Sequence, residues 1–346
     1  MQEAAFWSVQ VLAWNDLAHL SDLLSSLDEQ TEPGWQMVLI DHPGTRGITD
    51  ALRQERPNLS VIRNAHDRGF SKSHNQGFSF SLARWNMDVR DDRFFLISHP
   101  DVILEPHLLS RLEEAFRADP HLMIAGPKLR KIGLRINEEG EGREVEFTET
   151  LETAGWMLKK DRKLVFSGEG EEDRGQADEI DPRISPSWSC FAIRASLFSM
   201  LEKEGVWLSE FLDEPMPIID LVWRTRLLGF SVRMVPGALA WHHAHERRTL
   251  DKKRHLAYKR YQPDRARLQT TIYLLELKNG ARRHLIQQAP WLIWGCVKWA
   301  FVSLRHPRQF GRFCLSLGLI PDVFGERWQK KGERRISPKS IRSWFV

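Results

Sequence analysis

Short apolar runs and helical apolar stripes alternate through the first part of the chain. Apolar runs bounded by turn residues are typical of buried strands, and apolar positions three and four residues apart are typical of helices. An alternation of the two favours a mostly parallel sheet with helices on its faces, so the sequence predicts an α/β fold. Strands are predicted at 6–14, 36–41, 59–63, in the run that ends before Asp101 and at 123–126, and helices at 16–30, 70–85 and 109–116.

The pattern changes at residue 128. Residues 128–185 are rich in Glu, Gly, Lys and Arg, and within them we expect a mobile loop at 138–142 and a hairpin at 156–166. Beyond this segment the sequence predicts a strand at 187–194, a helix at 218–228, a strand at 234–241 and helical structure from Lys252 to about Leu319. We therefore expect two regions, an α/β domain at 1–246 and a helical C-terminal extension at 247–346.

Composition is that of a globular protein, with 42% hydrophobic and 28% charged residues. Three cysteines are too few for a disulfide framework or a zinc site, so a reducing, cytoplasmic setting is expected. The start of the sequence lacks the pattern of a signal peptide, and no stretch of 18 apolar residues occurs. A membrane-spanning helix is therefore not expected.

Basic residues concentrate towards the C-terminus. Residues 247–346 hold 23 of the 50 Lys and Arg residues, whereas the first 246 residues are acidic overall. This basic region contains the apolar run 291–302, in which tryptophans have Lys298, Arg305, Arg308 and Arg312 nearby. The run suits an interfacial helix on an anionic membrane surface, at the inner face of the membrane, and equally a buried helix packed on the main domain. No nucleic-acid motif accompanies the charge, so nucleic acid is not an expected partner.

The stretch 93–102 begins with an apolar run that ends abruptly at a carboxylate, in His99-Pro100-Asp101. Ligands of open α/β sheets bind at the carboxyl ends of the strands, where Asp101 is expected. A carboxylate at this edge can hold a divalent cation such as Mg²⁺ or Mn²⁺, and the cation can hold a diphosphate. The alternative is that Asp101 caps the helix predicted at 106–118 or closes a turn.

The stretch from His99 to Pro106 resembles the metal-binding edge of family-2 glycosyltransferases, which have the GT-A fold. The segment 38–47 is similar to the part of that family in which an Asp contacts the nucleotide, and Asp41 matches this position. Arg46 stands where the family has a second Asp. Arg46 is a candidate phosphate contact, although it fits a solvated loop residue equally well. For Asp41 the alternative is a turn-forming Asp.

Two further stretches extend the resemblance. In 63–77, Gly69 and Ser71 match small residues that let the backbone approach a nucleotide at a helix N-terminus, and Asn75 belongs to the same motif. In Trp241-His242-His243-Ala244-His245, His242 matches a histidine that joins the Asp motif in holding the metal. The alternative for His242 is a surface turn rich in histidine.

The segment 166–178 resembles a loop of rhamnosyltransferase-like members, for which the alternative is a purely structural role. Through this loop the resemblance leans towards a deoxysugar donor.

A departure from the family occurs at its catalytic helix. Residues 220–230 match the end of that helix, but the family's Glu-Asp pair is replaced by Pro217 and Ile218, neither of which can accept a proton. Asp213 and Glu214 lie just upstream and are candidate substitutes. Asp220 is retained as a third catalytic candidate, at a position that in the family more often orders the start of the helix.

The resemblance thus implies an inverting, metal-assisted transferase. It would move a sugar from a nucleotide-diphospho-sugar to a glycan or lipid-linked glycan acceptor. The alternative is a pseudoenzyme that keeps the fold and nucleotide binding and serves as a scaffold in glycan assembly, which Pro217, Ile218, Arg46 and His99 favour.

Overall fold

The structure of the protein is a computed structural model. It describes residues 6–13, 19–41, 46–136, 143–179, 181, 184–201, 207–243, 265–279, 286, 289–290, 293–295, 297–298, 300–301, 314, 317–329 and 343–344.

Strands and helices alternate in the first part of the chain, as the apolar pattern predicts. The strands are β1 (Trp7–Ala13), β2 (Trp35–Asp41), β3 (Leu59–Arg63), β4 (Phe94–Ser98), β5 (Val102–Leu104), β6 (Leu122–Ile136), β7 (Arg143–Thr153), β8 (Trp156–Leu158), β9 (Leu164–Phe166), β10 (Cys190–Arg194) and β11 (Ser231–His242). The helices are α1 (Leu20–Asp28), α2 (Arg46–Glu55), α3 (Gly69–Leu82), the 3₁₀ helix η1 (Met87–Asp92), α4 (Leu108–Ala118), α5 (Ser196–Leu201), α6 (Met216–Leu227), α9 (Arg265–Asn279) and α12 (Ile320–Gln329).

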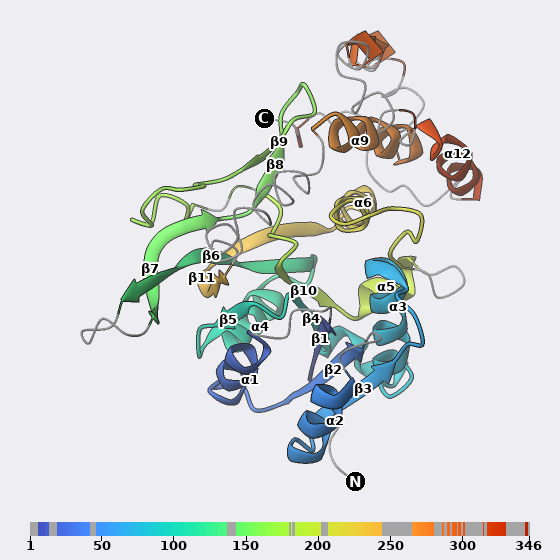
Figure 1. Cartoon of the computed structure of the whole chain (residues 1–346). Coiled ribbons are helices and arrows are strands. Elements are labelled where there is room, and N and C mark those ends of the chain that lie inside the picture. Colours follow the sequence, from blue (N-terminus) through green and yellow to red (C-terminus); the bar gives the residue numbers. More distant parts are fainter. Residues whose placement is uncertain are drawn as a thin grey trace.

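A nine-stranded sheet forms the centre of the molecule, and the β8–β9 hairpin is separate from it (Figure 1). The strand order is β3-β2-β1-β4-β10-β6-β11-β5, with β7 paired to β6. Strands β3, β2, β1 and β4 are parallel, as are β6 and β11, whereas β10 runs antiparallel between the two groups. The predicted α/β fold is confirmed, with β10 joining its two parallel parts.

Helices cover both faces of this sheet, and each face has its own core. Trp7, Val9 and Val11 of β1 lie in the core that α1 and α4 close, whereas Leu12 lies in the core under α3, α5 and α6. Both faces of β1 are therefore buried, as expected of a central strand in a parallel sheet. The leucine stripe predicted near residues 16–30 is the buried face of α1.

The region after residue 122 differs most from the sequence-based expectation. Strand β6 continues to Ile136 instead of ending near Gly126, and the unpredicted β7 pairs antiparallel with it. Glu, Thr and apolar residues alternate along β7, but its many glutamates conceal the strand in composition. Helices α2 and α5 and strand β5 were also not predicted, and the predicted loop at 138–142 lies outside the described residues.

The hairpin predicted at 156–166 is confirmed by β8 and β9. From its turn, Arg162 reaches α9 and donates to the carboxylate of Glu276, at 2.7 Å between Arg162 Nη2 and Glu276 Oε1. Both side chains are buried, and Ile272 and Leu275 of α9 belong to the same core as α6. Helix α9 therefore packs against the α/β region, close to the hairpin and α6 (Figure 1).

Helical structure continues beyond α9 in the part of the basic extension that the structure describes, and α12 contacts α9. Within the described residues, no helix combines the length and the apolar character needed to cross a membrane.

Candidate active site at the carboxyl edge of the sheet

Strand pairing brings Asp101 and His242 together. Asp101 lies in the turn between β4 and β5, and β5 pairs antiparallel with β11 so that Val102 faces His242. His242 Nε2 lies 3.3 Å from Asp101 Oδ1, and both side chains are buried. Helix α4 starts at Leu108 after His107, so Asp101 does not cap it. Burial also excludes the alternative of a surface turn for His242.

The other imidazole nitrogen of His242 is held by a glutamate that sequence reasoning missed. Glu152, near the end of β7, lies with Oε2 2.7 Å from His242 Nδ1. A carboxylate behind a histidine fixes the tautomer and leaves Nε2 to act as a metal ligand. Burial lowers the pKa of His242, but the carboxylates of Glu152 and Asp101 outweigh burial and hold the pKa well above its ordinary value. A proton and a metal ion therefore compete for this imidazole.

His99 completes a group of potential metal ligands. One ligand atom from each of His99, Asp101 and His242 lies within 4.8 Å of the others, and the two imidazole centroids are 5.8 Å apart. One carboxylate and two imidazoles suit a divalent ion, with coordination positions left for a ligand such as a diphosphate. The residues present at this edge therefore fit the metal that the sequence predicts.

Among the catalytic candidates, Glu214 lies beside this cluster. Its Oε1 is 2.9 Å from His99 Nε2, and both side chains remain about a quarter exposed. Asp213 is exposed, and its backbone carbonyl accepts a hydrogen bond from the amide of Met216. His74 of α3 lies near Glu214 and His99, and burial lowers its pKa to about 3 against the opposing charge of Glu214. The imidazole of His74 is therefore neutral at physiological pH.

Asp220 has a different environment. Its carboxylate is fully buried in α6 and accepts hydrogen bonds from Arg224 Nε at 2.9 Å, Lys278 Nζ at 2.9 Å and Asn279 Nδ2 at 2.8 Å. Ser209 Oγ donates to it as well, at 3.1 Å. These partners come from α6, α9 and the segment before α6, so Asp220 ties three parts of the chain together. This geometry supports an ordering role for Asp220.

Asp41 ends β2 and lies at the same edge of the sheet as Asp101. Its buried carboxylate accepts a hydrogen bond from Thr49 Oγ1 of α2, at 3.0 Å. Strand β1 separates β2 from β4, which places Asp41 about 10 Å from the end of β4 at the usual strand spacing. Arg46 is the first residue of α2, and its side chain lies outside the described part of the structure.

The glycine motif lies at the N-terminus of α3, as predicted. Gly69 has a φ of 74°, which an L-residue rarely adopts, and its amide donates to Asp67 Oδ1 at 2.7 Å. Ser71 is buried in the first turn. The Asn75 amide accepts from Leu208 N and donates to Leu208 O, both at 3.0 Å. Asn75 therefore fastens α3 to the segment before α6 in this structure.

The predicted loop at 166–178 supports β7. Asp173 is buried in this loop and pairs with Lys128 at 2.9 Å and Arg130 at 2.8 Å, both on β6. Its backbone amide donates to the carbonyl of Glu149 on β7, at 2.8 Å. The loop thus stabilises the strand that carries Glu152.

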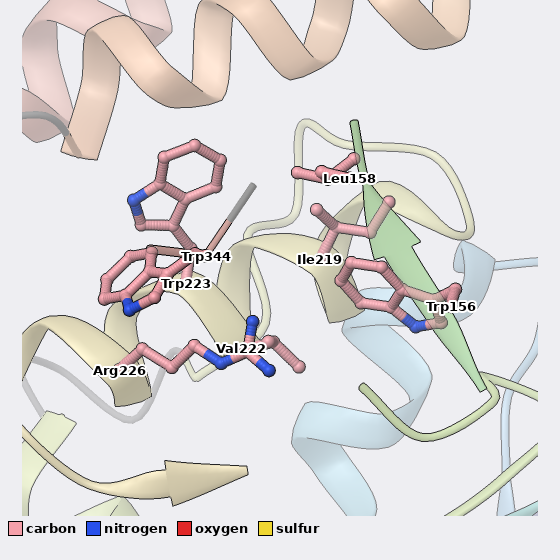
Figure 2. A pocket seen from close by; sticks show the side chains of 7 residues that line it. All are labelled: Trp156, Leu158, Ile219, Val222, Trp223, Arg226 and Trp344. Atoms are coloured by element: carbon pink, nitrogen blue, oxygen red, sulfur yellow. The ribbon is translucent and has the colours of Figure 1, made fainter. Parts of the chain in front are cut away.

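Neither of two cavities in the described part of the structure contains the imidazole cluster. The more enclosed one has about 20 Å³, room for roughly one water, and its lining includes Trp156, Trp223, Arg226 and Trp344 (Figure 2). The other is an open groove of about 600 Å³ along α3 whose cationic lining includes Lys72. The enclosed cavity is too small for a nucleotide. The groups that could bind a metal ion line neither cavity and lie at the carboxyl edge of the sheet, which is therefore the candidate site.

Comparison with known proteins gives a family match and distant structural likenesses. The model of the family described as Glycosyl transferase family 2 matches residues 8–165, slightly less than half of the 346-residue chain. No protein of curated function matches the chain.

Solved structures that resemble this chain include GalNAc-T7 with UDP, GalNAc and Mn²⁺, at 14% identity and a TM-score of 0.48. That likeness covers 68% of this chain but only 43% of GalNAc-T7. The mannosyltransferase PcManGT from Pyrobaculum calidifontis in complex with GDP-Man and Mn²⁺ is 13% identical, with a TM-score of 0.47 and coverage of 95% and 89% of the two chains. S. aureus TarS 1–349 is 15% identical, with a TM-score of 0.43 and coverage of 97% and 91%. Likenesses this distant carry no information about substrate.

Proposed function

We propose that this protein is a glycosyltransferase that uses a nucleotide-diphospho-sugar and a divalent metal ion. The observation that carries the proposal is the cluster of His99, Asp101 and His242 at the carboxyl edge of the sheet, with Asp41 at the same edge. The match of residues 8–165 to the family-2 model supports the same reading.

Each of the side chains at this edge would have a separate role in binding the metal ion and the nucleotide. Asp101 and His242 would hold the divalent ion, which when bound neutralises charge on the departing diphosphate. Glu152 would keep Nε2 of His242 directed at the ion through the 2.7 Å contact with Nδ1. Asp41, together with the amides around Gly69, would contact the nucleotide.

Glu214 is the proposed general base, replacing the Glu-Asp pair that is absent here. Ile218 occupies one of those positions and is buried inside α6. Glu214 is partly exposed, and it lies 2.9 Å from His99, a member of the metal cluster. Its carboxylate would accept the proton of an acceptor hydroxyl that attacks the anomeric carbon, which inverts the configuration. We propose a glycan or lipid-linked glycan as acceptor and, through the loop at 166–178, a deoxysugar donor.

Calorimetry tests nucleotide binding. We expect the protein to bind a nucleoside diphosphate, from a panel with different bases, more tightly with Mn²⁺ than without it. Asp101→Ala should abolish this metal-dependent gain, whereas Asp88→Ala, in the exposed helix η1, should keep it. A gain that persists in Asp101→Ala would refute the metal assignment.

Turnover tests the base. Transfer to acceptor, or hydrolysis of the donor, should fall by roughly 10²- to 10⁴-fold in Glu214→Gln while nucleotide binding stays the same. Metal-dependent nucleotide binding by the wild type without turnover, across a panel of donors and acceptors, would instead establish the pseudoenzyme alternative.

We also propose that the basic extension places the enzyme on an anionic membrane surface. Ile293, Val297 and Phe301 are helical, spaced four residues apart and therefore on one helix face, and they are more than half exposed, as is Trp294. These four side chains are therefore not buried, as those on the packed face of a buried helix would be. Apolar side chains on a helix with basic residues nearby are typical of an interfacial helix.

Vesicle sedimentation tests this location. The wild type should pellet with phosphatidylglycerol vesicles at low salt and not with phosphatidylcholine vesicles. A Trp294→Ser/Phe301→Ser double variant should lose most of this binding, whereas Met87→Ser removes an equally exposed side chain elsewhere and should keep it. Absence of the wild type from the pellet at low salt would contradict the proposal.

A further inference from the structure

A second group of metal-ligating side chains lies next to the first, on the other side of the end of β11. His243 follows His242 directly, and consecutive side chains at the end of a strand point in opposite directions. His242 is directed at Asp101 and Glu152, whereas His243 lies beside Asp22 and His19 at the start of α1. The backbone between the two histidines is fixed, because His243 N donates to Asp101 O at 3.0 Å.

The distances within this second group fit the coordination sphere of a metal. His243 Nε2 lies 3.4 Å and His19 Nδ1 3.7 Å from the same oxygen, Asp22 Oδ2. Both distances exceed the roughly 2.7–3.2 Å of good N–H···O hydrogen bonds. They lie close to the roughly 3.3–3.6 Å that separates two ligands on a tetrahedral Zn²⁺ with bonds of about 2.0–2.2 Å. The two imidazole rings are stacked, with centroids 4.0 Å apart, and one ligand atom from each of the three residues lies within 4.8 Å of the others.

We propose that His19, Asp22 and His243 form a second metal site, which takes Zn²⁺ or a similar transition-metal ion. Two imidazoles and one carboxylate are a common protein ligand set for zinc, and a water would complete four-coordination. His243 is buried while Asp22 is 40% exposed, so the site is open to solvent on the side of α1. The ion would tie the start of α1 to the end of β11, the strand end that carries His242. Its role is therefore to position the edge described above.

Zinc retention in a background without the first site tests this proposal directly. The full-length Asp101→Asn protein, loaded with Zn²⁺ and desalted, should retain about one equivalent by elemental analysis. Adding His19→Ala or the isosteric Asp22→Asn should remove it, whereas adding His121→Ala, an exposed histidine elsewhere, should not. Circular dichroism establishes that each variant is folded.

Cobalt gives a second readout at the same site. Co²⁺ bound to Asp101→Asn should show the visible absorption of a four-coordinate ion, and this absorption should disappear in Asp101→Asn/Asp22→Asn. Retention of zinc by the His19 and Asp22 variants, or its absence from Asp101→Asn itself, would overturn the proposal. These results do not depend on sugar transfer, because Asp101→Asn removes the carboxylate of the first site in every arm.

Discussion

Asp101 and Asp220 are both deeply buried carboxylates, yet the groups around them differ in kind. Asp220 accepts from Arg224, Lys278 and Asn279, with Ser209 as a fourth donor. Asp101 lies at the sheet edge beside the imidazoles of His242 and His99. Burial alone therefore does not distinguish the carboxylate of the proposed site from a structural one.

The nature of the neighbouring bases makes the distinction. Arg224 and Lys278 pair with Asp220 at 2.9 Å each, and this buried ion network holds α6 and α9 together. Imidazoles can release their protons and become metal ligands, so the group at Asp101 can exchange a proton for a divalent ion. Of the two carboxylates, the one among imidazoles has the chemistry of a binding site.

The largest predicted effect is on stability, at Asp220. Asp220→Asn would leave the buried ammonium of Lys278, which is fully shielded from solvent, without its carboxylate. We expect a loss of about 3–5 kcal/mol in the free energy of unfolding, measured by chemical denaturation. Asp28→Asn, which removes a half-exposed pair with Arg56, serves as the control and should change stability by less than about 1 kcal/mol. Equal effects of the two substitutions would contradict the network.

The next effect is on metal affinity, at Glu152. Glu152→Gln keeps the shape of the side chain but weakens its hold on His242 Nδ1. We expect Mn²⁺ affinity to fall by roughly 10- to 100-fold, with little change in the free energy of unfolding. Glu149→Gln changes an exposed glutamate on the same strand and should leave metal affinity unchanged. Isothermal titration with Mn²⁺ measures both, and equal affinities in the two variants would remove Glu152 from the site.

The smallest effect is on the pH dependence of stability, at Asp173. Like Asp220, this carboxylate is paired with cationic side chains. Burial raises the pKa of Asp173, but hydrogen bonds from Arg130 and Lys128 outweigh it and leave the pKa below its usual 3.8. A carboxyl group with a lower pKa in the folded state than in the unfolded state stabilises the fold at pH values above the unfolded-state pKa. This stabilisation is lost as the pH falls through the folded-state pKa.

Asp173→Asn should therefore destabilise the protein by about 1–2 kcal/mol at pH 7 and equally at pH 5. The difference from the wild type should shrink below about pH 4. Denaturant titrations at these pH values measure it. A difference that grows on acidification would contradict the assignment.

Much of the fold could be predicted from the sequence, because its first strands and helices have clear periodicity. The stripe of α1 and the apolar run of β3 define their own elements, and the change of pattern at residue 128 is visible in composition. Strand β7 was missed because its many glutamates give the segment the composition of a polar loop, and Glu152 was missed with it. The site candidates themselves stay predictions: the structure brings Asp101, His242 and Glu214 to one region and places Asp220 and Asn75 in structural contacts.

The sequence by itself determined most of the strands and helices in the first part of the chain, and that Asp41 and Asp101 follow two of these strands. Local periodicity suffices to predict these elements, because it depends only on residues that are close together in the sequence. Only the tertiary structure decided what each polar group faces. Pairing of β5 with β11 brings His242 to Asp101, and packing of α9 on α6 brings Lys278 to Asp220. Such contacts join residues more than fifty positions apart, and they depend on strand order and helix packing, which no local pattern specifies.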